Sequence, residues 1–317
     1  MKKEWIFLLA VGACLSSCNS DEETSSASEA RNMPHAIELS AQACGYTSAS
    51  ALPWSEGASI GVYALKAGTA TLMAPYSNVR YHAGTPLFAA NNEAETIQLP
   101  ATGEAWDVAA YFPYTSEATA EGEVPVSVAD QQKLATDNVL YARVGSVNNV
   151  GYKALLPMRP VLPQLVFSIQ ITGNYSTSDA QAVSVTLKGF PTSGFLNVAD
   201  GSLRVPSQTS TANIVLPTLK GEPEREYGSL AKAIVNLKGV VMPVQLTGGC
   251  QADVHLPGIG DFTVELSRYQ MTFESGYSYL FTLKYVDGSL QVKVTASAIA
   301  GWENGGSVSG EGREETK

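Results

Sequence analysis

A serine between two glycines is the strongest candidate for catalysis in the sequence. Gly57-Ala-Ser-Ile-Gly61 fits the G-x-S-x-G pattern, in which a strained turn between a strand and a helix exposes a nucleophile, here Ser59. Residues 60–65 read as a strand and not as a helix, however, and no β-α-β pattern surrounds them. A turn that leads into a buried strand accounts for these residues better, and we expect no serine hydrolase.

The remaining candidates for catalysis are weaker still. His35, His82 and His255 are isolated in the sequence, and neither H-E-x-x-H nor C-x-x-C occurs, so no ligand set for a transition metal is predicted. The two carboxylates of a glycoside hydrolase would be paired in space and not in sequence. The acidic residues lie mostly near the two ends and in expected loops, where a solvated surface accounts for them. The sequence therefore predicts no enzyme, no metal and no cofactor.

Cys18 has the clearest chemical role in the chain. Lys2 and Lys3 precede an apolar run at residues 5–13, which has the order of an export signal but is shorter than the roughly 20 residues of a membrane span. The run ends in Leu15-Ser-Ser-Cys18, which resembles the lipobox of bacterial lipoproteins. That resemblance implies cleavage before Cys18 and acylation of its thiol, which would anchor the protein to a membrane. An ordinary cleaved signal is the alternative, and Cys14 ends a weaker lipobox.

The segment after Cys18 is acidic and rich in serine. Asn19-Ser-Asp-Glu-Glu23 resembles the export tag that carries Bacteroidetes lipoproteins to the outer face of the outer membrane. A solvated tether is the alternative, because residues 21–30 show no apolar periodicity. We therefore predict a signal peptide at residues 1–17, a tether at residues 18–34, and a lipid-anchored protein of the outer membrane that faces the cell exterior.

Composition points to a β-rich protein that does not bind nucleic acid. The net charge is −10, whereas phosphate binding requires a basic surface. The chain has 28 Gly and 16 Pro but only 16% charged residues, which indicates many turns and short strands. Two cysteines, Cys44 and Cys250, belong to the expected folded part. They could form a disulfide in an oxidising compartment or be two buried thiols, and the sequence leaves both possibilities open.

Alternation of apolar and polar residues, the period of a half-buried strand, is clearest in the second half of the chain. The best runs are residues 167–171, 183–187, 262–266, 277–285 and 290–294. Asp287-Gly288 and Asp200-Gly201 carry the strongest short hairpin signal, because an Asp-Gly pair suits a type I′ turn. The best candidate for a helix is Tyr227 to Leu237.

Strands in the first half are shorter and more interrupted, at residues 60–65, 96–99, 106–112 and 124–128. Many short strands between turn residues predict an all-β protein with β-sandwich domains. Gly145 to Gly151 interrupts the pattern and suggests a boundary. We predict an N-terminal β-sandwich at residues 35–150, a C-terminal β-sandwich at residues 151–303 and a flexible tail at residues 304–317.

Three segments resemble the fimbrillin family of Bacteroidetes, which is related to type V pilins. Trp54 to Tyr63 is similar to the family's W-x-x-G-x-x-I-G-V-Y signature, Trp106 to Tyr114 to its W-x-h-x-A-Y-x-P-Y strand (h is apolar), and Leu290 to Trp302 to its last strand. The resemblance implies two tandem sandwiches of transthyretin-like, Greek-key topology and a role as a fimbrial subunit or adhesin. It also implies assembly by strand addition, after an Arg-specific protease removes an N-terminal strand.

The sequence departs from the stalk subunits of that family. Arg31, the possible processing site, precedes the first expected strand at residues 36–43, so cleavage there would release the lipid without opening a groove. The tail after Trp302 has no apolar alternation with which to fill a neighbour's groove. We therefore expect an anchor, accessory or tip subunit. Its partners would be other fimbrial subunits, the outer membrane and a host or bacterial surface ligand. A stand-alone glycan-binding lipoprotein is the alternative.

Overall fold

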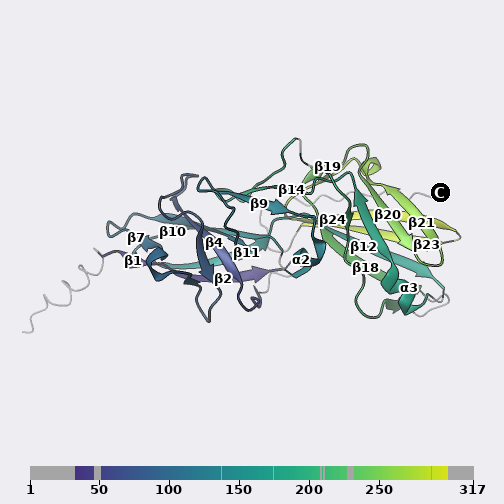
Figure 1. Ribbon diagram of the computed structural model, residues 1–317, viewed down its shortest axis with the longest axis horizontal. Helices are drawn as coiled ribbons and strands as arrows, with labels where there is room; N and C mark the ends of the chain where they lie inside the picture. The colour runs from purple at the N-terminus through teal and green to yellow at the C-terminus, as the bar shows by residue number, and fades with distance from the viewer. Residues whose placement is uncertain are drawn as a thin grey trace, which may run out of the picture.

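The protein is all-β, as the alternation predicts, and its few helical segments are short. The computed structural model describes residues 33–45, 51–136, 138–173, 175–207, 209, 211–226, 232–286 and 288–298. Within these ranges the helical segments are α2 (Gln131–Thr136), α3 (Thr177–Ala182), η1 (Glu93–Glu95) and η2 (Leu266–Tyr269). The molecule is elongated, with the early strands toward one end of the long axis and the late strands toward the other (Figure 1).

The early strands form one large sheet, here called the first sheet. Its order is β3-β2-β11-β10-β8-β4-β5-β6. The strands are β2 (Glu38–Cys44), β3 (Ala51–Leu52), β4 (Ser59–Lys66), β5 (Val79–His82), β6 (Ala89–Ala90), β8 (Trp106–Phe112), β10 (Leu140–Val147) and β11 (Lys153–Pro160). Only the β2–β11 pair of this sheet is parallel. A short pair, β1 (His35–Ala36) with β7 (Gln98–Leu99), lies beside it.

The central strands of the first sheet are buried on both faces. Every residue of β8 and all but the last residue of β4 are buried. One face, with Ile60, Val62 and Val108, packs into a core confined to the early strands. The other face, with Tyr63 and Tyr111, belongs to a larger core that continues into the late strands. The continuous apolar composition of these strands follows from this double burial.

The late strands form a five-stranded sheet packed on smaller ones. The large sheet has the order β17 (Glu224–Glu226), β18 (Lys232–Val240), β12 (Gln164–Thr172), β23 (Tyr277–Val286) and β24 (Ser289–Ala298). A four-stranded sheet has the order β16 (Ile214–Val215), β13 (Ser184–Lys188), β20 (Gln251–Leu256) and β21 (Gly260–Glu265), and β19 (Val244–Gln245) pairs with β22 (Thr272–Phe273). In the core, the rings of Phe167 and Phe281 stack at 4.8 Å.

Early and late segments of the chain are interwoven. Strand β9 (Glu123–Ser127) pairs with β14 (Ser193–Asn197), which also pairs with β15 (Leu203–Arg204). The Gln131 side chain donates to the carbonyl of Val240 at 2.8 Å and accepts from its N–H at 2.9 Å. The division into two sandwiches between residues 150 and 151 stays a prediction. The strand after that point, β11, is hydrogen-bonded to β2 and β10 of the first sheet, and the next strand, β12, belongs to the large late sheet.

Several local predictions can be compared with the structure. The hairpin at Gly288 joins β23 to β24, and the one at Gly201 joins β14 to β15, so both hairpins are confirmed. The turn at Asp200-Gly201 is not type I′, because only Gly201 of the pair has a positive φ. The helix predicted from Tyr227 to Leu237 is wrong, because Lys232 to Val240 is a strand that pairs with β12 along its whole length; residues 227–231 lie outside the described residues. Cys44 and Cys250 are both buried and form no disulfide with each other.

Candidate functional site

The two site residues predicted from the sequence, Cys18 and Arg31, lie outside the described residues, so acylation and processing remain predictions. The structure does show the first strands that come after Arg31. Strand β1 begins at His35 and β2 at Glu38. Among the described residues, no helix is long and apolar enough to cross a membrane.

Strand β2 is seated between β3 and β11 as an integral part of the first sheet. Its parallel pairing with β11 runs from Glu38, opposite Lys153, to Ala43, opposite Met158. Leu39 is fully buried, and its carbonyl accepts a hydrogen bond from the N–H of Phe88 at 2.8 Å. Removal of β2 would therefore uncover both the backbone edge of β11 and an apolar groove, which is the kind of surface that a foreign strand can fill.

Trp54 contacts β2 and stabilises its position between β3 and β11. Its indole N–H donates to the carbonyl of Ala41 at 2.8 Å. Its ring makes edge-to-face contacts with Phe88 and Phe112, each at 5.3 Å between centroids. The tryptophan of the first motif is therefore a packing residue. Trp54 is partly buried, Trp106 is buried beside Tyr76, and Trp302 lies outside the described residues.

Ser59 and His82 are brought together, although nothing in their sequence positions connects them. Strands β4 and β5 pair these two residues directly, and the Ser59 Oγ lies 2.9 Å from the His82 Nδ1. The His82 Nε2 lies 2.7 Å from the Asn91 Oδ1, and the Arg80 Nη2 donates to the Ser59 Oγ at 3.3 Å. This cluster follows from the register of β4 on β5, so a correct prediction of that register would have identified it.

The cluster around Ser59 lacks the local structure of a nucleophile elbow. Ser59 is the first residue of a strand, only 7% exposed, and no helix follows it. Its hydroxyl also lies within hydrogen-bonding distance of the Gly57 carbonyl, at 3.2 Å. The expectation that this serine sits in a turn leading into a buried strand agrees with its place at the start of β4.

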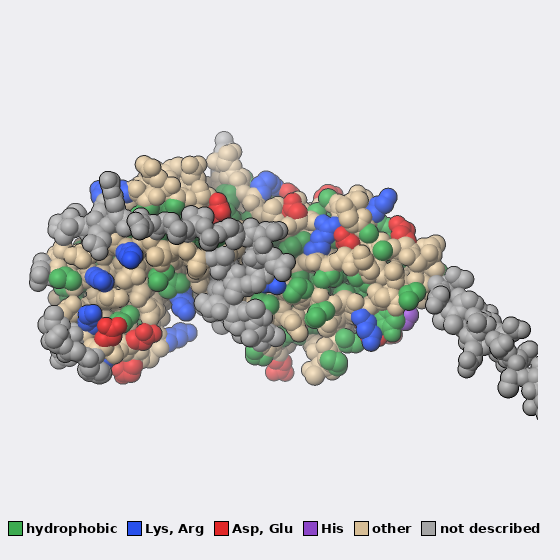
Figure 2. Space-filling model, turned by 180° about the vertical axis from the view of Figure 1, so that it is seen from behind, with side chains coloured by type: hydrophobic (Ala, Val, Ile, Leu, Met, Phe, Trp, Pro, Cys, Tyr) green, Lys and Arg blue, Asp and Glu red, His purple; other side chains and the backbone are tan. Residues whose placement is uncertain are grey.

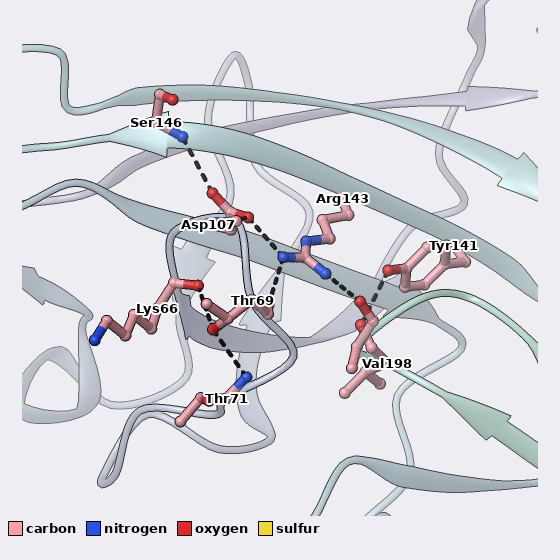
Figure 3. Close-up of polar contacts among 10 residues, drawn as sticks. Lys66, Thr69, Thr71, Asp107, Tyr141, Arg143, Ser146 and Val198 are labelled. Carbon is pink, nitrogen blue, oxygen red and sulfur yellow. Dashed lines mark hydrogen bonds and ion pairs between the residues drawn. The ribbon is translucent and has the colours of Figure 1, made fainter.

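A second polar cluster joins the first sheet to the β14–β15 hairpin (Figure 3). The Arg143 Nη2 lies 2.6 Å from the Asp107 Oδ2 and 2.6 Å from the Thr69 carbonyl oxygen. The same guanidinium donates to the carbonyl of Ala199, in the hairpin loop. The neighbouring Tyr141 hydroxyl donates to the carbonyl of Val198 at 2.9 Å. These side chains are therefore a structural joint between early and late strands.

Asp107 is the charged centre of this joint. It is 6% exposed and accepts from the backbone N–H of Gly68 at 3.0 Å and of Ser146 at 3.3 Å. Ser146 lies in a β-bulge of β10 with a φ of 63°, which turns its N–H toward the carboxylate. Burial raises the pKa of Asp107, but the hydrogen bonds from Arg143, Gly68 and Ser146 outweigh it, and the pKa is lowered from its usual value.

Neither a metal centre nor a basic surface emerges from the part of the chain that the structure describes. No three His, Cys, Asp or Glu side chains among the described residues are grouped so that they could hold a metal ion. On the face shown in Figure 2, acidic and basic side chains of the described residues are interspersed. This face does not offer the continuous positive surface that nucleic acid requires.

Comparison with solved structures identifies the fold. A protein from Bacteroides uniformis assigned to cell adhesion matches with a TM-score of 0.64 and 21% identity, over 84% of this chain and 99% of that chain. A protein from Bacteroides ovatus with the same assignment matches with a TM-score of 0.63 and 17% identity, over 84% of this chain and 98% of that chain. A search of the curated proteins finds no match. At these identities, the similarity establishes the fold alone.

The family is established by the sequence itself. The model of the family described as fimbrillin-like matches residues 47–302, which is well over half of the chain. The match includes all three segments that carry the resemblance. The first of them leads into β4, and the second begins with the adjacent strand β8. The chain belongs to the fimbrillin-like family.

Proposed function

We propose that this protein is a lipid-anchored subunit of the cell surface that serves in a fimbria as an anchor, accessory or tip subunit. Fimbrillin-like proteins are structural and adhesive, and the chain is not an enzyme. Acylated Cys18 would hold it in the outer membrane, and its partners would be other fimbrial subunits. The negative net charge is consistent with a protein that does not bind nucleic acid.

The position of β2 between β3 and β11 is the main observation in support of this proposal. Arg31 lies before β1, and neither Lys nor Arg occurs between it and Lys66. An Arg-specific protease that cuts after Arg31 would release the chain from its lipid but would leave β2 paired with β11. The groove beneath β2 would stay filled by the protein's own strand. A subunit with a filled groove cannot accept a strand there, which favours a place at the end of a fibre over a place within the stalk.

Intact-mass measurement of the protein from purified outer membranes tests the proposal. We expect a mass that begins at acylated Cys18 before treatment with an Arg-specific protease. If the protease acts, the new mass should begin at Asn32. Cys18→Ser should abolish acylation, and Arg31→Ala should prevent release while leaving acylation intact. A mature protein that begins beyond Cys44, and so has lost β2, would overturn the proposal, as would a chain that is not acylated and stays in the periplasm.

A further inference from the structure

Arg80 has no acidic partner in the part of the chain that the structure describes. Its side chain is half-buried on β5, and its one hydrogen bond is to the neutral hydroxyl of Ser59 at 3.3 Å. By contrast, Arg143 pairs with Asp107 at 2.6 Å and Arg204 with Glu123 at 2.5 Å. A partly buried guanidinium usually has a carboxylate as its partner. Among the described residues, Arg80 therefore presents a positive charge that an acidic ligand could neutralise.

The Arg80 side chain lines a recess on the surface. The recess has a volume of about 260 Å³ and is formed by two loops and a strand end, at residues 55–59 and 112–114. The guanidinium lies over the ring of Tyr114, with its Cζ 5.0 Å from the ring centroid. This contact orients the guanidinium. Its Nε is buried and has no acceptor among the described residues, so an acceptor in the recess would meet the two Nη groups.

We propose that this recess binds the carboxylate of an acidic sugar. A planar guanidinium recognises a carboxylate through two parallel hydrogen bonds, which an Arg held by an aromatic ring is prepared to make. The volume lies just below the range of about 300–1,000 Å³ that is usual for drug-sized ligands, so the recess suits one sugar ring and not a longer chain. The backbone of the loops at residues 55–58 and 112–114 adds polar groups for sugar hydroxyls.

A peptide is a poorer fit at this position. Extended peptides commonly bind by adding a strand to a free sheet edge. Strand β5 has no such edge here, because it pairs with β4 on one side and with β6 on the other. The carbonyl of Arg80 itself accepts from the N–H of Asn91 at 2.8 Å. An acidic ligand would therefore have to enter the recess from its open side, as a small ring can.

Two other titratable groups are close to the recess. Glu56 lines it and is exposed. His82 contacts the Ser59 hydroxyl from β5. Because Glu56 would repel an anion weakly through solvent, its replacement by glutamine should tighten binding and not weaken it. This expected gain distinguishes a carboxylate ligand from a neutral one.

Calorimetric titration of the full chain with single sugars tests the inference. Glucuronate, galacturonate and N-acetylneuraminate are the probes, glucose is the neutral control, and acetate and N-acetylaspartate are carboxylates without a sugar ring. We expect at least one acidic sugar to bind, with affinity at least tenfold above that for glucose, acetate or N-acetylaspartate. Arg80→Gln and Arg80→Lys should each lower that affinity at least tenfold, since lysine keeps the charge but not the fork.

Arg204 provides a matched control, because its Cζ also lies 5.0 Å from an aromatic centroid, that of Phe195. Arg204→Gln should leave binding unchanged, and thermal unfolding should show that all three variants fold. The inference would be overturned if glucose or N-acetylaspartate bound as tightly as the best acidic sugar, or if a folded Arg80→Lys variant bound as tightly as the unaltered chain. Binding of none of the three acidic sugars would overturn it too. The inference adds a ligand class to the proposed adhesive role and does not depend on acylation, so either can fail without the other.

Discussion

The ring of Tyr111 lies directly on the backbone of Gly61. A Cβ placed on Gly61 would be 2.2 Å from the Cε1 of Tyr111 and 2.5 Å from its Cζ. The two residues are opposite each other in the β4–β8 pair. The Tyr111 hydroxyl donates a hydrogen bond to the Asn78 Oδ1 at 2.7 Å and accepts one from the N–H of Thr115 at 3.2 Å. The glycine of the first aromatic motif is thus required by the tyrosine of the second.

This relationship predicts that Gly61→Ala destabilises the protein. The new methyl group would force the pinned ring of Tyr111 or the backbone of β4 to shift, and we expect a loss of about 2–3 kcal/mol in the free energy of unfolding. Urea denaturation measures it. Gly248→Ala is the control, because a Cβ there meets nothing within 4 Å, and it should change stability by less than about 0.5 kcal/mol. Equal effects of the two substitutions would contradict the explanation.

The hydroxyl of Tyr111 should contribute separately from its ring. Tyr111→Phe keeps the packing but leaves the Asn78 Oδ1 without its donor and the Thr115 N–H without its acceptor. We expect a loss of about 1–3 kcal/mol, because buried polar groups without partners are costly. Tyr152→Phe is the matched control: this tyrosine is only partly buried and contacts His35 through its ring face. If the control costs as much, the network at Thr115 contributes nothing specific.

Asp107→Asn should weaken the joint between early and late strands. The substitution leaves the guanidinium of Arg143 without its anionic partner, and 24% of that side chain is exposed, so some solvent remains to compensate. We expect a loss of about 2–4 kcal/mol, near the lower end for a broken buried pair. Lys153→Gln is the comparison, because Lys153 is the exposed partner of the Lys153–Glu38 ion pair. It should lower the free energy of unfolding by less than about 1 kcal/mol.

The lowered pKa of Asp107 predicts how the stability of the protein changes at acidic pH. A carboxyl whose pKa is lower in the folded state stabilises the fold above its unfolded pKa of about 4, and this contribution is lost as the pH falls through the folded value. Stability should therefore decline below about pH 4. In Asp107→Asn, the decline should be shallower in urea denaturation series at successive pH values. If the decline were equally steep in the variant, other carboxyl groups would account for the loss of stability at acidic pH.

Alkaline pH should destabilise the protein for a different reason. Burial raises the pKa of Tyr81 and of Tyr111 to about 12, and it raises those of Tyr63 and Tyr141 as well. The neutral phenols stabilise the fold fully below the unfolded pKa of about 10, and that contribution is lost as the pH rises through about 12. The urea concentration at the unfolding midpoint should fall steeply between about pH 10 and about pH 12. Tyr81→Phe should make this fall with pH less steep. Constant midpoints up to pH 12 would refute the assignment.

Local patterns in the sequence were enough to predict the strands but not which strands meet. The alternation at residues 167–171 and 277–285 identifies β12 and β23, because each strand has one face in the core. The error at residues 227–237 shows the limit of such patterns. Ala233, Val235 and Leu237 alternate inward as in any strand, and pairing with β12 decides the conformation of a segment whose local pattern also allowed a helix.

The polar clusters could not be predicted for a related reason. Ser59 and His82 are 23 positions apart and meet only because β4 and β5 pair in one particular register. Arg143 meets Ala199 only because the β14–β15 hairpin packs against the first sheet. A register shifted by one residue would send these side chains to opposite faces. Spacing in the sequence carries no information about such contacts.

The parallel pairing of β2 with β11 also has a consequence for the order in which the chain can fold. The hydrogen bond from the Ser40 hydroxyl to the carbonyl of Ala154 spans 114 positions, so β2 has no neighbour on that side until most of the early half has been synthesised. Contacts this distant in the sequence form slowly. Between the formation of β11 and the docking of β2, the groove beneath β2 is open, and β2 competes there with strands from other chains. Folding time, and not only the final structure, therefore bears on which strand occupies the groove.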